Sequence, residues 1–95
     1  MSLSRQRLSN EEAQHFVKES DWAIVDNKFE RDFLFKDFKE AWSFLSRVAL
    51  ISEELNHHAE IFNVYNQVTL KLSTHECEDG KSGLSQLDIH FIQQL

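Results

Sequence analysis

Apolar and polar residues along the chain switch between the helical period of about 3.6 and the strand period of 2. The first segment, LSNEEAQHFVKES, has helical spacing; Ser9 and Glu12 have the spacing of a capping box, and Leu8 is placed to pack on the first turn. The next segment, DWAIVDNKFERDFLF, alternates around a turn at Asp26-Asn27. Its alternating apolar residues are Trp22, Ile24, Phe29, Phe33 and Phe35. The pattern predicts a helix followed by a β-hairpin.

The segment KDFKEAWSFLSRVALISEELNHH returns to helical spacing, and Asp37 and Glu40 lie in its first turn, where the helix dipole favours negative charge. Its apolar residues form a broad belt: Phe38, Trp42, Leu45, Ala49 and Leu55, widened by Phe44, Val48 and Ile51. Such a belt has two interpretations. Either the whole helix is buried in the core, or one side of it packs against another subunit.

The following segment, EIFNVYNQVTLKLST, alternates again and predicts a second hairpin. A two-residue turn at 66–67 would place polar residues opposite apolar ones, whereas a three-residue loop pairs Val64 with Val68. We therefore expect the three-residue loop. Continued along both strands, that register places His75 opposite His57.

The last segment, LSQLDIHFIQQL, is helical, with Ser85 as its cap and Asp88 three residues later. Its apolar stripe consists of Leu87, Phe91, Ile92 and Leu95. The glycines Gly80 and Gly83 mark CEDGKSGLS as the main flexible loop. The element order predicts one α+β domain over residues 1–95, an α-β-β-α-β-β-α two-layer sandwich. Its four-stranded antiparallel sheet carries the helices on one face.

The net charge of −6 and the lack of a basic run argue against nucleic-acid binding. The only close basic pair, Arg5 and Arg7, lies near a terminus that we expect to fray. A single cysteine, Cys77, excludes an internal disulfide and is typical of a reducing compartment. No apolar run approaches the roughly 18 residues of a membrane span, and the first residues do not read as a secretory signal. We expect a soluble, cytoplasmic protein.

Four candidate functional residues lie at the end of the long helix and at the open end of the second hairpin: His57, His58, His75 and Cys77. A histidine at a helix end is commonly a partner of the helix dipole, and this reading stays open for His58. A metal site is disfavoured, because adjacent histidines diverge and the usual zinc spacings are missing. Acid–base catalysis is the third reading, since imidazole titrates near neutral pH. The remaining histidines, His15 and His90, have no partner in the pattern.

The segment RVALISEELNHHAEIFNVYNQVTLKLSTHEC resembles the signature of the pterin-4a-carbinolamine dehydratase family. That signature has an acidic residue four positions before a His-His pair, an aromatic strand, a THEC-like segment, and an Asp at the start of the last helix. These parts correspond here to Glu53, His57-His58, 62–66, 74–77 and Asp88. Because LSNEE and FKDF also match, the resemblance spans nearly the whole chain.

The resemblance implies a hydro-lyase that needs no cofactor. Such an enzyme eliminates water from the 4a-hydroxytetrahydropterin released by aromatic amino-acid hydroxylases and returns quinonoid dihydropterin for tetrahydrobiopterin recycling. The residues His57, His58 and His75 would line the pterin site. We expect His58 to be the principal general acid, with the other two as base and positioning residues.

Further site residues follow from the same resemblance. Those expected to contact the polar edge of the pterin are Asn56, Ser73, Thr74 and Glu76. In the signature Glu53 and Cys77 lie next to them. The role of Asp88 is open between a site residue and the capping acid of the last helix.

Two departures from the family stand out: Ala59 replaces the usual proline after the histidine pair, and the link 78–84 before the last helix is longer than usual. The family also implies a homodimer or homotetramer that forms through a sheet edge and through the helix from Phe38 to Leu55. Some relatives serve as dimerisation cofactor of a homeodomain transcription factor, which makes a non-catalytic interaction module, located also in the nucleus, the alternative function.

Overall fold

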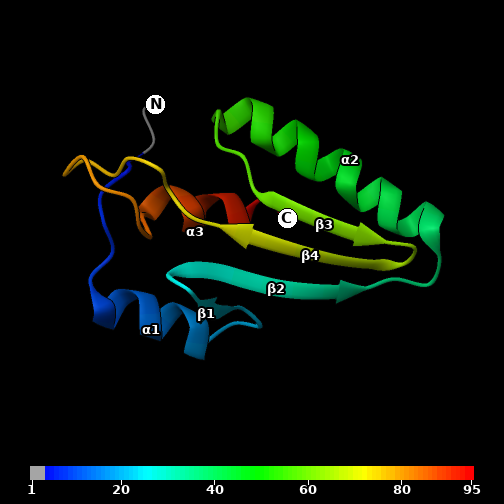
Figure 1. Ribbon diagram of the computed structural model, residues 1–95, viewed down its shortest axis with the longest axis horizontal. Helices are drawn as coiled ribbons and strands as arrows, with labels where there is room; N and C mark the ends of the chain where they lie inside the picture. Colours follow the sequence, from blue (N-terminus) through cyan, green and yellow to red (C-terminus); the bar gives the residue numbers. More distant parts are fainter. Residues whose placement is uncertain (1–3) are drawn as a thin grey trace.

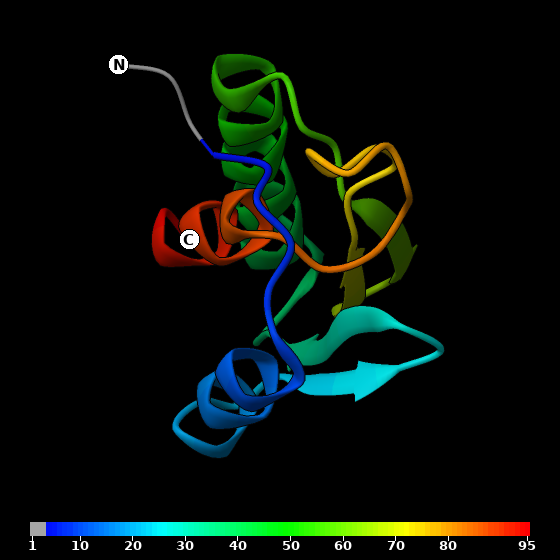
Figure 2. The same ribbon diagram turned by 90° about the vertical axis from the view of Figure 1, so that its left-hand side faces the viewer.

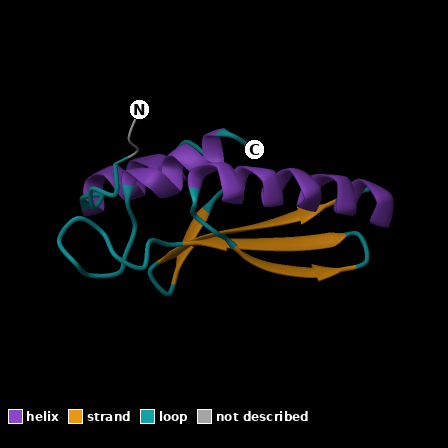
Figure 3. Cartoon of the chain, turned by 90° about the horizontal axis from the view of Figure 1, so that it is seen from above, coloured by secondary structure: helices purple, strands orange, loops and turns teal. Residues whose placement is uncertain are grey.

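The computed structural model describes residues 4–95, which form three helices and one four-stranded antiparallel sheet (Figure 1). The elements are α1 (Asn10–Lys18), β1 (Ala23–Val25), β2 (Lys28–Leu34), α2 (Phe38–Leu55), β3 (Glu60–Val64), β4 (Gln67–Leu72) and α3 (Gln86–Gln93). The strand order is β1-β2-β4-β3, so the second hairpin joins the first through β4 and leaves β3 at an edge. All three helices lie on one side of the sheet (Figures 2 and 3). The predicted α+β sandwich is confirmed.

Local signals set the first half of the chain. The hydroxyl of Ser9 accepts from the Glu12 N–H at 3.0 Å, and the Glu12 carboxylate accepts from the Ser9 N–H at 2.9 Å. This is the predicted capping box, and it lowers the pKa of Glu12 through those hydrogen bonds. The turn of the first hairpin is also as predicted, because Asp26 and Asn27 both have positive φ, 51° and 60°. Such a turn matches the twist of the flanking strands.

The register of the second hairpin differs from both of the registers considered above. The turn is Tyr65-Asn66, and the pairs include Ile61 with Leu70 and Val64 with Gln67. The preferred pairing of Val64 with Val68 is therefore wrong. Because β3 is an edge strand, its apolar side chains need not lie opposite apolar partners, and Val64 remains 56% exposed.

The core lies between the sheet and the helices. It is built from Phe29 of β2, from the apolar side chains of β4, from one face of α2, and from Phe91 of α3. The buried residues of α2 are Ala41, Leu45, Val48, Ile51 and Ser52. The predicted belt is thus only partly buried: Phe38 and Trp42 are 45% and 57% exposed, and the fully buried interpretation of the helix is wrong. Within residues 4–95 no helix is both long enough and apolar enough to cross a membrane.

The segment before α1 is held against the link between β4 and α3, contrary to the expected fraying. The Leu8 N–H donates to the Leu84 carbonyl at 2.9 Å, and the Glu78 N–H donates to the Arg5 carbonyl at 3.0 Å. An isolated bridge pairs Arg7 with Ser85. The two segments run side by side in Figures 1 and 2. These hydrogen bonds hold both ends of the long loop against the N-terminal segment.

Candidate active site

The C-terminus of α2 sets the direction of the histidine pair. Asn56 has left-handed φ and ψ of 49° and 45°. The Asn56 N–H donates to the Glu53 carbonyl at 3.4 Å, and the His57 N–H donates to the Ser52 carbonyl at 3.0 Å. This is a Schellman motif, in which an asparagine tolerates the left-handed position better than most side chains. The motif ends the helix and sends His57 inward and His58 outward.

His57 is buried, with 9% of its surface exposed, and its Nε2 lies 2.6 Å from Oδ1 of the fully buried Asp88. The other oxygen of Asp88 accepts from Thr74 Oγ1 and from the Ser85 N–H, both at 2.9 Å. Thr74 Oγ1 is in turn 2.6 Å from Ser85 Oγ. Since Thr74 and Ser85 both donate to Asp88, this carboxylate acts as an acceptor throughout, and His57 donates through Nε2–H.

This network fixes the tautomer of a neutral His57. With the proton on Nε2, the second nitrogen, Nδ1, carries a lone pair. Within residues 4–95 no hydrogen bond to Nδ1 is found, and since no buried side-chain nitrogen or oxygen there lacks a partner, this atom is accessible to solvent. The edge of the ring rests against Phe91, with 6.2 Å between ring centroids. Asp88 thus caps α3 through the Ser85 N–H, which is one of the two roles left open by the sequence, and it also binds His57, a predicted site histidine.

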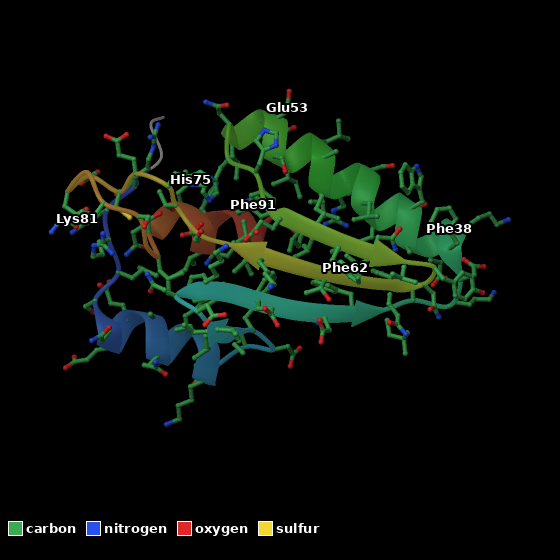
Figure 4. The ribbon with its side chains drawn as sticks, in the orientation of Figure 1. Phe38, Glu53, Phe62, His75, Lys81 and Phe91 are labelled. Carbon is green, nitrogen blue, oxygen red and sulfur yellow. The ribbon has the colours of Figure 1, made fainter. Side chains whose placement is uncertain are left out.

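His58 and His75 line one pocket with a volume of about 280 Å³. The pocket is also lined by Lys28, Glu60, Lys71, Ser73 and Ser82. His58 Nε2 lies 2.9 Å from a carboxylate oxygen of Glu53, which makes the two side chains an ion pair when the ring is protonated. Figure 4 shows Glu53 at the end of α2 and His75 beyond the end of β4. The histidines thus come from two elements that meet at one end of the sheet.

The route by which His75 reaches this pocket differs from the predicted one. The paired part of β3 begins at Glu60 and that of β4 ends at Leu72, so neither His57 nor His75 belongs to the paired ladder. The statement that His75 lies opposite His57 is therefore wrong. The two segments still lie at the same end of the sheet, because β3 begins there and β4 ends there (Figure 1).

The other predicted site residues lie in four places. Ser73 lines the histidine pocket, whereas Thr74 is buried in the Asp88 network. Glu76 and Cys77 line a separate depression with Arg5 and Glu78. Asn56 lies exposed at the end of α2.

Cys77 has the features of a structural thiol. Only 2% of its surface is exposed, and burial raises the pKa of the thiol. Its backbone N–H donates to the Lys81 carbonyl at 2.9 Å. A high pKa and low exposure both disfavour the reactive thiolate.

Sequence reasoning missed the polar walls of the pocket. Lys28 Nζ is 2.6 Å from Glu60 Oε2, and this hydrogen bond lowers the pKa of the Glu60 carboxyl. Lys71 Nζ is 3.5 Å from a carboxylate oxygen of Glu30. The sequence could have indicated these residues only through their positions, since β2 and β3 begin and β4 ends at this end of the sheet. Ser82 carried no signal, because it comes from the long loop.

The departure at Ala59 leaves this arrangement in place. Ala59 is half-buried and packs against the core, and the Schellman motif already fixes the chain direction before it. Among residues 4–95, no group of three or more His, Cys, Asp or Glu side chains is arranged to hold a metal ion.

The chain is similar to known proteins in sequence and in fold. The family model described as Pterin 4 alpha carbinolamine dehydratase matches residues 6–95. A protein of Prochlorococcus marinus (strain MIT 9515) that is named for the same dehydratase is 45% identical over 82 residues, which are 85% of this chain and 81% of that one. The crystal structure of a transcriptional coactivator/pterin dehydratase from Brucella melitensis superposes with a TM-score of 0.83 at 37% identity, covering 94% of each chain. The chain, with its histidine pair, its third histidine and its buried aspartate, belongs to the pterin-4a-carbinolamine dehydratase family of hydro-lyases.

Proposed function

We propose that the protein dehydrates 4a-hydroxytetrahydropterin to quinonoid dihydropterin at the pocket between His58 and His75. The observation that supports this most is that two imidazoles from different segments, His58 and His75, line one pocket, while the neighbour of His58 in the chain, His57, is held by a buried carboxylate. Two imidazoles can donate and accept protons together. Ser73 and Ser82 line the same pocket, but within residues 4–95 neither hydroxyl is hydrogen-bonded to a histidine, so a proton shuttle suits the site better than covalent catalysis.

In the proposed reaction the C4a–O bond breaks, the N5–H proton leaves, and a C4a=N5 double bond forms, with water as the other product. The leaving hydroxyl needs a proton donor, and the ring nitrogen needs an acceptor. We assign donation to His58, whose ring lines the pocket and whose Nε2 lies 2.9 Å from a carboxylate oxygen of Glu53; the Nδ1–H of the protonated ring is the proton assigned to the leaving hydroxyl. His75, lining the same pocket, is assigned as the base that accepts the N5 proton.

His57 is assigned a positioning role through its lone pair on Nδ1. Because Asp88 holds Nε2–H, the ring can only accept at Nδ1, and an N–H of the pterin is a suitable donor. The buried carboxylate keeps this orientation fixed before substrate arrives. The arrangement resembles other sites in which a carboxylate sets a histidine tautomer. The service to aromatic amino-acid hydroxylases in tetrahydrobiopterin recycling is part of the same proposal.

The direct test generates 4a-hydroxytetrahydropterin with a hydroxylase and follows its decay by ultraviolet absorbance. Wild-type protein should accelerate the decay in proportion to its concentration, and His57→Ala/His58→Ala should approach the rate in buffer. A folded wild-type protein that leaves the decay rate unchanged would remove the dehydratase from consideration.

A second candidate function, a protein-interaction module, is favoured by the outer face of α2. Phe38, Trp42 and Leu50 are 45%, 57% and 67% exposed, and an apolar groove lies between Trp42 and Ala49 of α2 and Ile61 of β3. We propose that this face and the free edge of β3 form the homodimer or homotetramer. We propose the same face as the surface on which a homeodomain transcription factor would bind; the name of the Brucella protein includes a transcriptional coactivator and names no partner.

The end of the outer face of α2 at Phe38 and Trp42 is apart from the proposed active site, since Figure 4 shows Phe38 at the right-hand end of the molecule and His75 in its left half. Trp42→Glu should therefore lower the molar mass measured by light scattering and leave the pterin pocket intact. The matched control is Lys39→Gln, which lowers the net charge by the same one unit at an exposed position of the same helix. An unchanged mass for Trp42→Glu would argue against assembly through α2.

A further inference from the structure

The loop 78–84, which the sequence predicts to be longer than in the family, is clamped by one side chain from the N-terminal segment. The guanidinium of Arg7 donates from Nε to Asp79 Oδ2 at 2.7 Å and from Nη2 to Asp79 Oδ1 at 3.1 Å. The same Nη2 is 3.2 Å from the Lys81 carbonyl and 3.0 Å from the Ser82 carbonyl. One planar fork thus joins three residues of the loop, as only arginine can.

The loop is also closed on itself and at its base. The Lys81 N–H donates to Asp79 Oδ1 at 3.0 Å, and the Gly80 N–H donates to the Cys77 carbonyl at 2.8 Å. At the base, Thr74 and Gly83 exchange two backbone hydrogen bonds of 2.7 Å and 2.9 Å. Gly80 takes a left-handed φ of 83°, which a glycine adopts without steric cost.

Gly83 provides the space in which the guanidinium lies. A Cβ built on this residue would be only 2.1 Å from Nη1 of Arg7. Any other residue at position 83 would therefore push the guanidinium away from Asp79 and Ser82. The clamp depends on this close approach as well as on charge.

The clamp acts next to the histidine pocket, because Ser82 lines that pocket with His58 and His75. The carbonyl of Ser82 accepts a hydrogen bond from Arg7. Thr74, which is paired with Gly83 at the base of the loop, lies between Ser73 and His75 in the sequence, and both of these residues line the pocket. Arg7 itself does not line the pocket. We infer that Arg7 is a positioning residue: by clamping the loop through Asp79 it holds Ser82 as a wall of the substrate pocket.

This inference rests on the proposed function, since the pocket is taken as the pterin site. Arg7 supplies no proton-transferring group, so its loss should weaken substrate binding in ground state and transition state alike. Such a loss raises KM and leaves kcat nearly unchanged. A side chain with only a structural role would instead lower the melting temperature or the fraction of active protein without a selective change in KM.

The experiment compares Arg7→Gln, Asp79→Asn and the double variant with wild type and with Arg47→Gln. The control removes a guanidinium from α2 that, within residues 4–95, donates only to the Gln94 carbonyl, at 3.3 Å. We expect KM to rise about threefold to tenfold in Arg7→Gln with kcat within about twofold of wild type. The double variant should be no worse than Arg7→Gln, because both changes remove the same contact. Amide exchange over residues 79–83 should become faster in all three loop variants and stay unchanged in Arg47→Gln.

An unchanged KM in folded Arg7→Gln, or a fall in kcat alone, would overturn the inference. If Arg7→Gln does not fold, Asp79→Asn decides by the same criterion, because it leaves the N-terminal segment untouched. A wild-type protein without dehydratase activity would refute the proposed function. In that case amide exchange still judges the clamp, and unchanged exchange of residues 79–83 in both single variants would refute it as well.

Discussion

Replacing Asp88 by asparagine changes the chemistry of the buried network while keeping its shape. Asp88 is fully buried and accepts three hydrogen bonds, from His57, Thr74 and Ser85. In Asp88→Asn the amide oxygen must face the Ser85 N–H, because that group can only donate. The amide NH₂ then faces His57 Nε2, which must become an acceptor. The proton of a neutral His57 moves to Nδ1, the nitrogen proposed to accept from the substrate.

The cost in stability follows from the three bonds. A hydrogen bond to a charged group contributes about 1.5–3 kcal/mol and a neutral one about 0.5–1.5 kcal/mol, whereas a neutral amide is easier to bury than a carboxylate. We expect Asp88→Asn to lower the free energy of unfolding by about 1–2 kcal/mol. For a domain of this size each kcal/mol lowers the melting temperature by about 4–8 °C. The protein should therefore still fold at room temperature.

The cost in activity should be much larger. Because His57 is assigned a positioning role, the reversed tautomer would set an N–H against the pterin N–H and misplace the substrate. A misplaced substrate can cost about 10²-fold in rate, and we expect kcat of Asp88→Asn to fall about 10²-fold. The assay is pterin dehydration, combined with ¹⁵N NMR of His57 to identify the protonated ring nitrogen. Asp32→Asn is the control, because Asp32 is exposed and, within residues 4–95, its carboxylate bonds only the Thr69 hydroxyl, at 2.6 Å. A kcat within threefold of wild type, with His57 in its changed tautomer, would refute the role given to Asp88.

Three other outcomes follow from the site. His58→Ala should lower turnover about 10²-fold in the dehydration assay, whereas His90→Ala on α3 should leave it unchanged; a loss of only a few-fold would move the acid role to another histidine. Asn56→Gly should keep or slightly raise the melting temperature and preserve activity, since glycine suits the left-handed position at 49°; a large loss of activity with an intact fold would instead support a substrate contact of Asn56. Cys77 should react slowly with a thiol reagent at pH 8 in the native state and rapidly in urea, because burial raises the pKa of its thiol; fast native labelling would contradict this.

Local signals in the sequence predicted much of the fold. The capping box at Ser9 and Glu12 and the turn at Asp26-Asn27 act over two to four residues, and the structure has both. The alternation between helical and strand spacing gave the element order. These features are readable because each depends on neighbours in the sequence.

The register of the second hairpin was not readable in the same way. Matching Val64 with Val68 assumed that apolar residues of both strands are buried together, but β3 is an edge strand and its Phe62 is 63% exposed. The interpretation of α2 as a fully buried helix was wrong for a related reason. Apolar residues such as Trp42 have helical spacing whether the chain itself or another molecule covers them, so periodicity alone cannot tell which stripe is buried.

The candidate site was predictable in part. The family signature named the three histidines, and the structure brings His58 and His75 to one pocket and pairs His57 with Asp88. The contact of Arg7 with the loop joins residues more than seventy positions apart and leaves no periodic pattern. Long-range polar contacts of this kind need the folded backbone.

The most direct test of the proposed active site is a crystal structure of the protein with a bound 7,8-dihydropterin. The proposal predicts that the pterin ring occupies the pocket between His58 and His75, with ring nitrogens of both histidines within hydrogen-bond distance of the C4a–N5 edge. The pterin ring should also lie next to Ser82 of the loop 78–84. A pterin bound elsewhere, such as in the groove between α2 and β3, or in the pocket with its N5 edge turned away from both histidines, would contradict the assignment.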